Sequence, residues 1–439
     1  MNQERKDLAR WAVNQIMIQG ADEASVSLAG QRTVSVQVRE GKIEKLQESV
    51  EQSLTLNIYA DHRYSSHTTN DLGRDTLEKF IAEAVAGTRY LSPDQFRTLP
   101  DPRLFPKAAS PELGICDPGF DSVQAKDRIR YAEAMEAVAR SFDPSLRSAT
   151  SDYSDFQRES VRITSNGFEG ENRSTTFSGS VEVTVADPKG GLPEDYAYAQ
   201  TRFRKDMPDP ETIGQEAAKR AVAKIGQRKI ASGRYPMVVE NRVGANLVGL
   251  LVGPMQARAI QQKSSFLDGM LGKPVAHTRL TLVDDPLVVH GLGSRPYDGE
   301  GLAAQKRVMI DQGILQQYYV DWYYGRKLGI EPTTGSASNL VVGPGAESSQ
   351  ALLEKLAPGI LVQGFIGGNS NPLTGDFSFG IVGMWVENGR IVHPVHEMNI
   401  SGNTLELWKR LSGVGNDPNP YSSWRVPSLW FEDVQFSGL

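Results

Sequence analysis

The chain has 439 residues, of which 39% are hydrophobic and 23% are charged, with a formal net charge of −6 and a single cysteine. This length favours two or three domains with buried cores. The acidic balance argues against direct binding to nucleic acid, because a duplex-binding surface needs a basic stripe. One cysteine excludes an internal disulfide and a cysteine-rich metal site. The sequence shows neither an apolar leader nor a stretch of about 18 uncharged apolar residues, so we expect a cytoplasmic protein.

Residues 1–91 have the pattern of a first α+β subdomain. Apolar side chains recur every three or four residues between residues 3 and 19 and predict a helix. Alternating polar and apolar residues then predict three strands, over 33–40, 53–60 and 63–70. A second helix follows, and we expect Asp75 to cap its start.

The same order of elements returns after a proline-rich connection over residues 92–120, which is expected to be extended. Residues 121–230 form the second predicted subdomain. They begin with a helix over 122–142, continue with strands joined by a turn at Asn166-Gly167, and end with a helix that Asp209 and Pro210 begin. Helix, meander and helix therefore occur twice, although the two halves share no strong residue identity.

Residues 231–439 form a larger predicted domain that is rich in strands. An apolar helix is expected over 243–262, with a kink at Pro254. Short strands and glycine-rich turns follow, interrupted by helices over 348–357 and 404–411. Because the strands cluster instead of alternating with helices, the sequence favours an α+β fold.

Two histidines near the C-terminus, His393 and His396 in the segment HPVHE, have the residue types of a metal site. The segment follows Asn388-Gly389, which is typical of a tight hairpin turn, and is therefore predicted to be a strand. Side chains three positions apart on a strand point to opposite faces, so these imidazoles could share an ion only through a bulge. Pro394 favours an edge position. We interpret the segment as a strand with two surface histidines.

Other nucleophile and metal motifs are weaker still. No histidine follows His396-Glu397 at the spacing of a zinc-peptidase helix. The G-x-S-x-G motif of a serine nucleophile is absent. The remaining histidines fall on opposite strand faces or stand alone, namely His62, His67, His277 and His290.

The loop RPYDGEGLAAQKR, residues 295–307, carries two acidic residues beside glycines. Asp298 and Glu300 are two positions apart, and Arg307 follows. Alternate carboxylates beside a flexible backbone could receive the amine of a substrate or the arginine of a partner. A solvated acidic turn would explain the same residues.

Six C-terminal segments occur in a specific order, namely YDGEG, VMIDQGILQQYYVDWYYGRKLG, TGSAS, GGNSNPLTGDFSFGIVGMWVENGRIVHPV, NISGNTLELWKRLSGVGND and PSLWFEDVQFSG. In this order and spacing they resemble the TldD/PmbA family, whose members were once called modulators of DNA gyrase. The segment YADHRYSSHTTNDL in the N-terminal half agrees. The resemblance therefore covers nearly the whole chain.

Within that family the chain resembles the PmbA branch, also called TldE, which lacks the zinc motif. TldD-type members resemble zinc peptidases in which a His-Glu-x-x-x-His helix and a later cysteine hold the metal. The matching helix here, ANLVGLLVGPMQAR, has only aliphatic residues around Leu247 and Val252, where the two histidines would fall. The single cysteine, Cys116, lies in the N-terminal half of the chain, whereas the metal-binding cysteine of TldD-type chains comes after the helix. Aliphatic side chains cannot bind zinc, and burying a dication against them would be prohibitive. We expect no catalytic residue, metal ligand or cofactor in this chain, with zinc carried by a TldD-type partner.

The resemblance implies one subunit of a TldD/TldE metalloprotease that cleaves unstructured peptides. This chain would shape the chamber and help to hold the peptide in a heterodimer with a TldD-type chain, and alone it could form a homodimer. Neither nucleic acid nor a membrane is an expected partner. Substrate contacts are expected from the acidic loop and from the Asn/Gly-rich turn at 367–376, namely Asp298, Glu300, Arg307, Asn369, Asn371 and Asn403.

Three alternatives remain open from the sequence alone. The chain could be an active metallopeptidase in its own right, as the family name suggests. It could be a regulator associated with DNA gyrase, since its acidic charge argues against contact with DNA but not against contact with a protein. It could also be a scaffold that has no partner.

Overall fold

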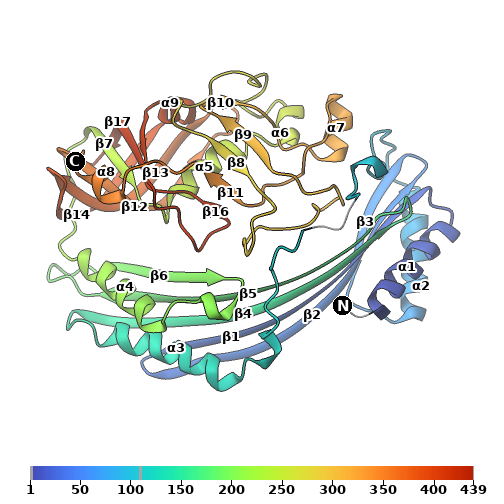
Figure 1. Cartoon of the computed structure of the whole chain (residues 1–439), viewed down its shortest axis with the longest axis horizontal. Helices are drawn as coiled ribbons and strands as arrows, with labels where there is room; N and C mark the ends of the chain where they lie inside the picture. The colour runs from blue at the N-terminus through green and yellow to red at the C-terminus, as the bar shows by residue number, and fades with distance from the viewer. Residues whose placement is uncertain (1–2, 108–110, 439) are drawn as a thin grey trace.

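A computed structural model describes residues 3–107 and 111–438. A long curved sheet carries helices on its outer side, and the strand-rich C-terminal part lies on its concave side (Figure 1). Helices and several separate sheets occur together, which confirms the predicted α+β class. No helix among the described residues is both long and apolar enough to cross a membrane.

The curved sheet joins the two N-terminal halves into one antiparallel structure with the strand order β3-β2-β1-β4-β5-β6. Its strands are β1 (Glu23–Arg39), β2 (Lys42–Ala60), β3 (Arg63–Thr69), β4 (Leu146–Thr164), β5 (Glu169–Val185) and β6 (Glu194–Thr201). β1 pairs with β4 from Ser25 to Arg39, so the two predicted meanders share a continuous ladder. This pairing satisfies the backbone groups that two separate sheets would leave at their edges. Most of these strands are also longer than the sequence predicts.

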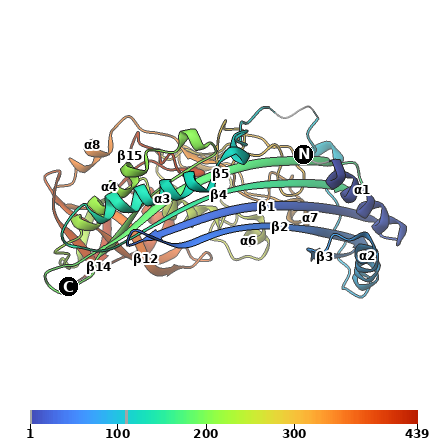
Figure 2. The same ribbon diagram turned by 90° about the horizontal axis from the view of Figure 1, so that it is seen from below.

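Two pairs of helices cover opposite ends of the outer face of this sheet (Figure 2). They are α1 (Gln3–Ile18) with α2 (Arg74–Thr88), and α3 (Ala125–Arg140) with α4 (Pro210–Ala223). Each pair closes its own apolar core against the strands. Asp209 is the N-cap residue of α4 and Pro210 its first residue, as predicted. The prediction for Asp75 is wrong, because Gly73 is the N-cap residue of α2 and Asp75 lies in the first turn.

The proline-rich connection runs between the curved sheet and the C-terminal part. It contains two short 3-10 helices, Pro102–Leu104 and Phe120–Ser122, and a third, Arg204–Asp206, follows β6. Ile115 O accepts a hydrogen bond from Thr175 N at 3.0 Å on the sheet, and Leu104 O accepts one from Ala303 N at 2.9 Å on the C-terminal side. Residues 108–110 of this connection lie outside the described residues.

The C-terminal part contains two sheets. The larger has the order β14-β13-β12-β7-β17-β15, and a further pairing of β14 with β17 brings its two halves together. Its strands are β7 (Gly233–Val239), β12 (Gly359–Ser370), β13 (Asp376–Glu387), β14 (Arg390–Asn403), β15 (Leu411–Val414) and β17 (Leu429–Ser437). The smaller sheet, β10-β9-β8-β11-β16, consists of β8 (Leu282–Asp284), β9 (Arg307–Asp311), β10 (Ile314–Leu315), β11 (Leu340–Val342) and β16 (Trp424–Arg425).

The single kinked helix predicted over 243–262 is two helices, α5 (Gly244–Val252) and α6 (Ala257–Gln261). Pro254 has no backbone N–H to continue the ladder, so α5 ends before it. The other helices are α7 (Trp322–Leu328), which the sequence did not predict, and α8 (Ser349–Leu353) and α9 (Thr404–Lys409), which are shorter than predicted. Buried residues of α5 belong to the main core, together with residues from both sheets.

Candidate functional site

The segment HPVHE lies on β14, directly after a turn in which Asn388 and Gly389 have φ values of 48° and 75°. This left-handed geometry confirms the predicted hairpin. The ring of His393 stacks on that of Trp385 with centroids 6.5 Å apart. His396 and Glu397 together oppose Val382 in a β-bulge, and Glu397 has a φ of 53°. The bulge thus turns His396 and Glu397 away from the geometry of a regular strand.

This segment does not make a metal site. The Glu397 carboxylate forms an ion pair with Lys229 Nζ at 2.8 Å, and His393 Nδ1 lies 3.0 Å from the carbonyl oxygen of Pro394. Both histidines are partly buried. In the parts of the chain that the structure describes, no group of three or more His, Cys, Asp or Glu side chains could hold a metal ion.

The sequence resemblance would place the zinc helix of TldD-type chains at α5, and the inner face of α5 is apolar and closed. Leu247 is fully buried and Val252 is 6% exposed, and both belong to the main core. A Cβ added at Gly244 would come within 2.7 Å of Val426 Cγ1, so this glycine allows the close packing of α5. These residues offer no donor atom to zinc.

Asp298 is buried and Glu300 is partly buried, so the alternative of a fully solvated acidic turn is wrong. Asp298 accepts hydrogen bonds from the backbone N–H groups of Glu300 at 2.9 Å and Leu302 at 3.0 Å, and from Thr334 Oγ1 at 3.0 Å. Its carboxylate therefore holds the loop in shape. The Arg307 side chain also forms a hydrogen bond within the chain, because its Nη2 donates to the carbonyl oxygen of Thr333 at 2.8 Å. Burial lowers the pKa of this guanidinium, and the nearby charges of Asp284 and Asp298 oppose that effect.

Glu300 lies at the junction between this loop and α7. Its Oε2 accepts a hydrogen bond from Trp322 N at 2.8 Å. Burial raises the pKa of the Glu300 carboxyl to about 7, the Trp322 N–H lowers it in part, and the carboxylates of Asp298 and Asp321 raise it further. A carboxyl with this pKa can hold or release a proton near neutral pH.

The Asn/Gly-rich turn lies elsewhere on the C-terminal part. Asn371 Oδ1 accepts a hydrogen bond from Leu373 N at 2.9 Å, which shapes the turn. Asn403 Oδ1 accepts one from Leu405 N at 3.1 Å as the cap of α9, and its Nδ2 donates to Thr374 O at 2.8 Å. Asn369 lines a hollow of about 470 Å³ beside this turn.

The predicted contact residues therefore form two groups. The first consists of Asp298, Glu300 and Arg307, and the second of Asn369, Asn371 and Asn403. No hydrogen bond between described residues joins the two groups. Arg307 also lines a cavity of about 550 Å³ between the acidic loop and the proline-rich connection.

A larger cavity, of about 600 Å³, lies between the curved sheet and the C-terminal part and was not predicted from the sequence. Glu182, Glu194 and Tyr196 line it from the sheet, and Asn246, Gln363 and His396 line it from the C-terminal part. Gln363 is the extra residue of a bulge on β12, next to Gly364, which pairs with Val382, and Val382 is also the residue opposite the bulge on β14. Adjacent bulges at one level turn side chains into a common space. The only sequence signal is Gly364, where a Cβ would come within 2.6 Å of Val382 Cγ2.

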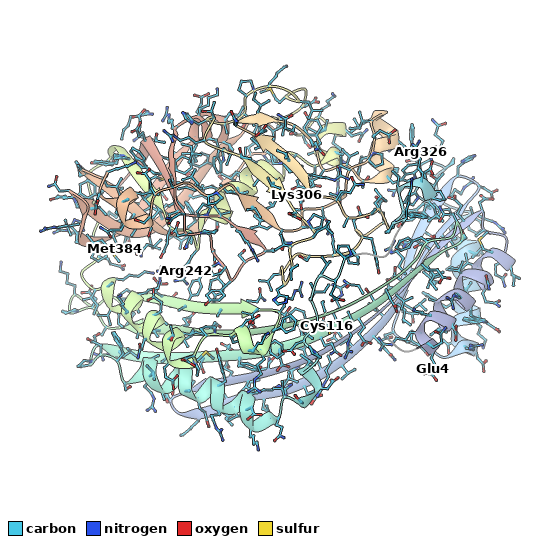
Figure 3. All side chains as sticks on the ribbon, in the orientation of Figure 1. Glu4, Cys116, Arg242, Lys306, Arg326 and Met384 are labelled. Carbon is cyan, nitrogen blue, oxygen red and sulfur yellow. The ribbon has the colours of Figure 1, made fainter. Side chains whose placement is uncertain are left out.

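The rim of this interdomain cavity is held by Arg242, which Figure 3 shows between the C-terminal part and β6. Its Nη2 donates to the carbonyl oxygen of Tyr196 at 2.7 Å, and its guanidinium lies 4.9 Å from the centre of the Tyr196 ring. Nearby, Asn419 Nδ2 donates to Tyr198 Oη at 2.8 Å. The Arg242 contacts tie the segment before α5 to the curved sheet, and the Asn419 contact adds a second attachment to β6.

Comparison with known proteins agrees with the C-terminal motifs. Three family models match this chain: PmbA/TldA metallopeptidase domain 1 over residues 24–87, the central domain over 118–225 and the C-terminal domain over 232–438. The chain belongs to the PmbA/TldD family. Metalloprotease PmbA of Escherichia coli O157:H7 is 30% identical over 421 residues, which cover 95% of this chain and 93% of that protein.

Solved structures of related proteins share the fold of this PmbA/TldD member. A Bacteroides thetaiotaomicron protein, crystallised as a candidate modulator of DNA gyrase, superimposes with a TM-score of 0.97 and 40% identity over the whole of both chains. TldE from Thermococcus kodakarensis superimposes with a TM-score of 0.86 at 19% identity, covering 99% of this chain and all of that one, and shows the fold alone. The resemblance inferred from the sequence is therefore confirmed.

Proposed function

We propose that this chain is the PmbA/TldE-type subunit of a two-chain, cytoplasmic, peptide-processing metalloprotease, in which a TldD-type partner carries the catalytic zinc. The observation that supports this most directly is the burial of Leu247 and Val252 in the main core. The helix that would present zinc ligands presents aliphatic side chains, so α5 offers no donor atom for a zinc ion that would activate a water, and we infer that this chain shapes the chamber and holds the peptide.

The interdomain cavity is the surface best suited to hold an extended peptide. Its wall includes the bulges at Gln363 and His396, where the strand ladder is locally interrupted. Interrupted ladders leave backbone groups that an extended peptide can pair with, while side-chain pockets select its residues. The Gln363 Oε1 atom is buried without a hydrogen-bond partner among the described residues, and a peptide N–H could satisfy it.

The residues predicted to contact the peptide differ in how free their side chains are to bind it. Asp298, Asn371 and Asn403 are held by hydrogen bonds that shape their own loops. Glu300 and Asn369 stay as candidate contacts, the first with a proton that exchanges near neutral pH and the second beside an open hollow. An assay of binding to an unstructured peptide tests them. Binding that is unchanged in both Glu300→Gln and Asn369→Ala would remove the two residues from the proposal.

Co-expression with a TldD-type chain tests the division of labour. We expect cleavage of an unstructured peptide only when both chains are present, with zinc retained by the partner after separation. The proposal fails if this chain alone binds one zinc ion per molecule and cleaves the peptide in a manner that a chelator abolishes. That result would establish the rival function, an active peptidase in its own right.

A link to DNA gyrase is a second candidate function, because the Bacteroides relative was crystallised under that description. The net charge of −6 disfavours direct contact with DNA, so any such link would be through protein. Co-purification with gyrase that survives nuclease treatment would support it.

A further inference from the structure

The cavity of about 550 Å³ beside Arg307 has a positively charged wall. It lies between the proline-rich connection and the loop that leads into β9. Among the described residues that line it, three are basic and none is acidic, and the basic ones are Arg103, Lys107 and Arg307. Several of the others are apolar, including Leu104, Phe105 and Leu302. A hollow with this lining favours a ligand in which an anionic group adjoins an apolar one.

The Arg307 guanidinium is partly buried and forms no ion pair with any residue that the structure describes. Its Nη2 donates to Thr333 O at 2.8 Å, and its other nitrogens have no acceptor in the described chain. Asp284 and Asp298 lower the cost of its charge only from a distance, since each carboxylate accepts hydrogen bonds from its own neighbours. The unused N–H groups can therefore donate charge-assisted hydrogen bonds to an oxyanion.

Lys107 adds a second charge to the same wall. Its side chain is exposed and pairs with no acidic residue within residues 3–107 and 111–438. Arg103 contributes less, because Asp101 Oδ2 lies 3.2 Å from its Nε and Glu331 Oε1 lies 3.6 Å from its Nη2. The charges of Arg307 and Lys107 are therefore the ones that an incoming anion would neutralise.

The apolar part of the wall decides between kinds of anion. The Phe105 ring packs on the Phe168 ring with centroids 5.1 Å apart, which holds it in place beside the cavity. Inorganic phosphate brings no apolar group to such a wall, whereas the last residue of a peptide can bring a carboxylate and an aliphatic side chain together. The family models that match this chain describe metallopeptidase domains, and each hydrolysis of a peptide bond creates a new C-terminal carboxylate.

We propose that the Arg307 cavity is an anchor for the C-terminal carboxylate of a peptide whose last side chain is apolar. Arg307 and Lys107 bind the carboxylate, and the apolar side chain lies against Leu104, Phe105 and Leu302. This anchor rests on the proposed function, in which the chain holds a peptide, and adds a second contact site to it. No described residue lines both the Arg307 cavity and the interdomain cavity.

Fluorescence anisotropy with three labelled peptides of glycine and serine tests the anchor in the full chain. The first peptide ends in leucine with a free carboxylate, the second is the same peptide as a C-terminal amide, and the third is an amide with glutamate in place of leucine. We expect the free acid to bind roughly ten-fold more tightly than either amide. Arg307→Gln should abolish this difference, and Lys107→Gln should reduce it.

Lys306→Gln is the matched control and should keep the preference for the free acid. Lys306, which Figure 3 labels, directly precedes Arg307 but does not line the cavity, and its Nζ pairs with Asp285 Oδ2 at 3.3 Å. Circular dichroism should confirm that the variants fold. Because Lys107 is exposed, Lys107→Gln tests the anchor even if Arg307→Gln does not fold.

The outcomes separate the anchor from the proposed function. Equal binding of the free acid and the leucine amide would overturn the anchor and leave the peptide-holding role intact, whereas binding of neither would overturn both. A glutamate amide that binds as tightly as the free acid would overturn the assignment to the chain terminus. A preference that survives unchanged in both Arg307→Gln and Lys107→Gln would place the carboxylate elsewhere and overturn the anchor too.

Discussion

Arg128 on α3 and Asp155 on β4 form a buried ion pair in which Arg128 Nε donates to Asp155 Oδ2 at 2.7 Å. Arg128 Nη2 donates to Asp155 Oδ1 at 3.1 Å, so the pair is bidentate. The side chains are 4% and 0% exposed. Tyr153 Oη also donates to Asp155 at 2.9 Å, and Arg128 Nη1 donates to the carbonyl oxygen of Val123 at 2.7 Å. This network fastens α3 to the curved sheet at a point where the surrounding core is apolar.

Removal of one partner of this pair should be strongly destabilising. Asp155→Ala leaves the Arg128 charge buried without a counter-ion, so we expect a loss of about 3–5 kcal/mol in the free energy of unfolding, measured with urea. The variant Glu406→Gln is the control, since Glu406 pairs with Lys409 at the surface at 2.8 Å and should change stability by less than about 1 kcal/mol. Similar losses of unfolding free energy in Asp155→Ala and Glu406→Gln would show that the buried ion pair does not stabilise the fold more than a surface pair does.

Glu300 should make stability depend on pH. Its folded pKa of about 7 lies above the ordinary value of 4.5. The folded state therefore favours the protonated carboxyl. Its contribution to the free energy of unfolding is fully present below pH 4.5 and is lost as the pH rises through 7. Glu300→Gln keeps an acceptor for the Trp322 N–H and cannot ionise. We expect it to match the native chain near pH 5 and to exceed its unfolding free energy by about 2 kcal/mol at pH 8.

Denaturant unfolding of the native chain and Glu300→Gln at both pH values measures this difference. Glu331→Gln serves as the control, because Glu331 is 78% exposed. A native-to-variant difference that is the same at pH 5 and pH 8 would show that Glu300 ionises as an ordinary carboxyl.

Two glycines of α5 should respond in opposite directions to alanine. At Gly244 a Cβ would come within 2.7 Å of Val426 Cγ1, whereas at Gly249 the nearest atom is Trp424 Cζ3 at 3.7 Å, an ordinary contact. We expect Gly244→Ala to cost about 1–3 kcal/mol because the helix must shift. Gly249→Ala should stabilise by up to about 1 kcal/mol because alanine favours the helix. Thermal unfolding of the two variants measures both, and a destabilised Gly249→Ala would indicate a tighter environment.

Arg202 should fasten the C-terminal part to the curved sheet. Its Nη1 donates to Thr175 O at 3.1 Å on β5, and its Nε donates to Gly291 O at 3.2 Å across the interface. Burial lowers the pKa of this guanidinium to about 10. The planar guanidinium of Arg202 donates in two directions at once, and the single ammonium of lysine cannot reproduce this geometry. We therefore expect Arg202→Lys to weaken the attachment of the Gly291 segment to the curved sheet by about 2 kcal/mol.

Hydrogen exchange around Gly291 reports on that contact, and we expect it to accelerate in Arg202→Lys. Exchange in α1 should not change, because α1 lies at the other end of the sheet. Arg89→Lys is a surface control, since Arg89 also donates to backbone carbonyl oxygens but is exposed. Equal protection of Gly291 in the native chain and Arg202→Lys would show that this arginine does not hold the interface.

The local elements were largely accessible from the sequence. The helices α1 to α4 show regular apolar spacing, and a helix needs only its own hydrogen bonds to be recognised. The hairpin at Asn388-Gly389 follows from the preference of these residues for left-handed backbone. α7 escaped prediction because only one of its seven residues, Gly325, is buried, so it has no apolar stripe.

Of the candidate site, the residue types alone showed that the segment of α5 is aliphatic, but they did not predict the interdomain cavity. Aliphatic residues around Leu247 and Val252 can be recognised from their letters alone. The interdomain cavity depends on bulges at Gln363 and His396, which arise only when β12, β13 and β14 are paired in one register. A register is a relation between distant segments, so no local pattern reveals where it slips.

The fold class, the family and the aliphatic character of the helix around Leu247 could be read from the sequence, because these depend on residue types and their local spacing. Only the packing of the whole chain places the two meanders in one sheet, buries Asp298, partly buries Glu300 and leaves the outer side of β2 residues 42–53 without a paired strand among the described residues. Each of these depends on which distant segments pack together. Pairing between distant strands is settled by the balance of burial and backbone hydrogen bonding over the whole chain.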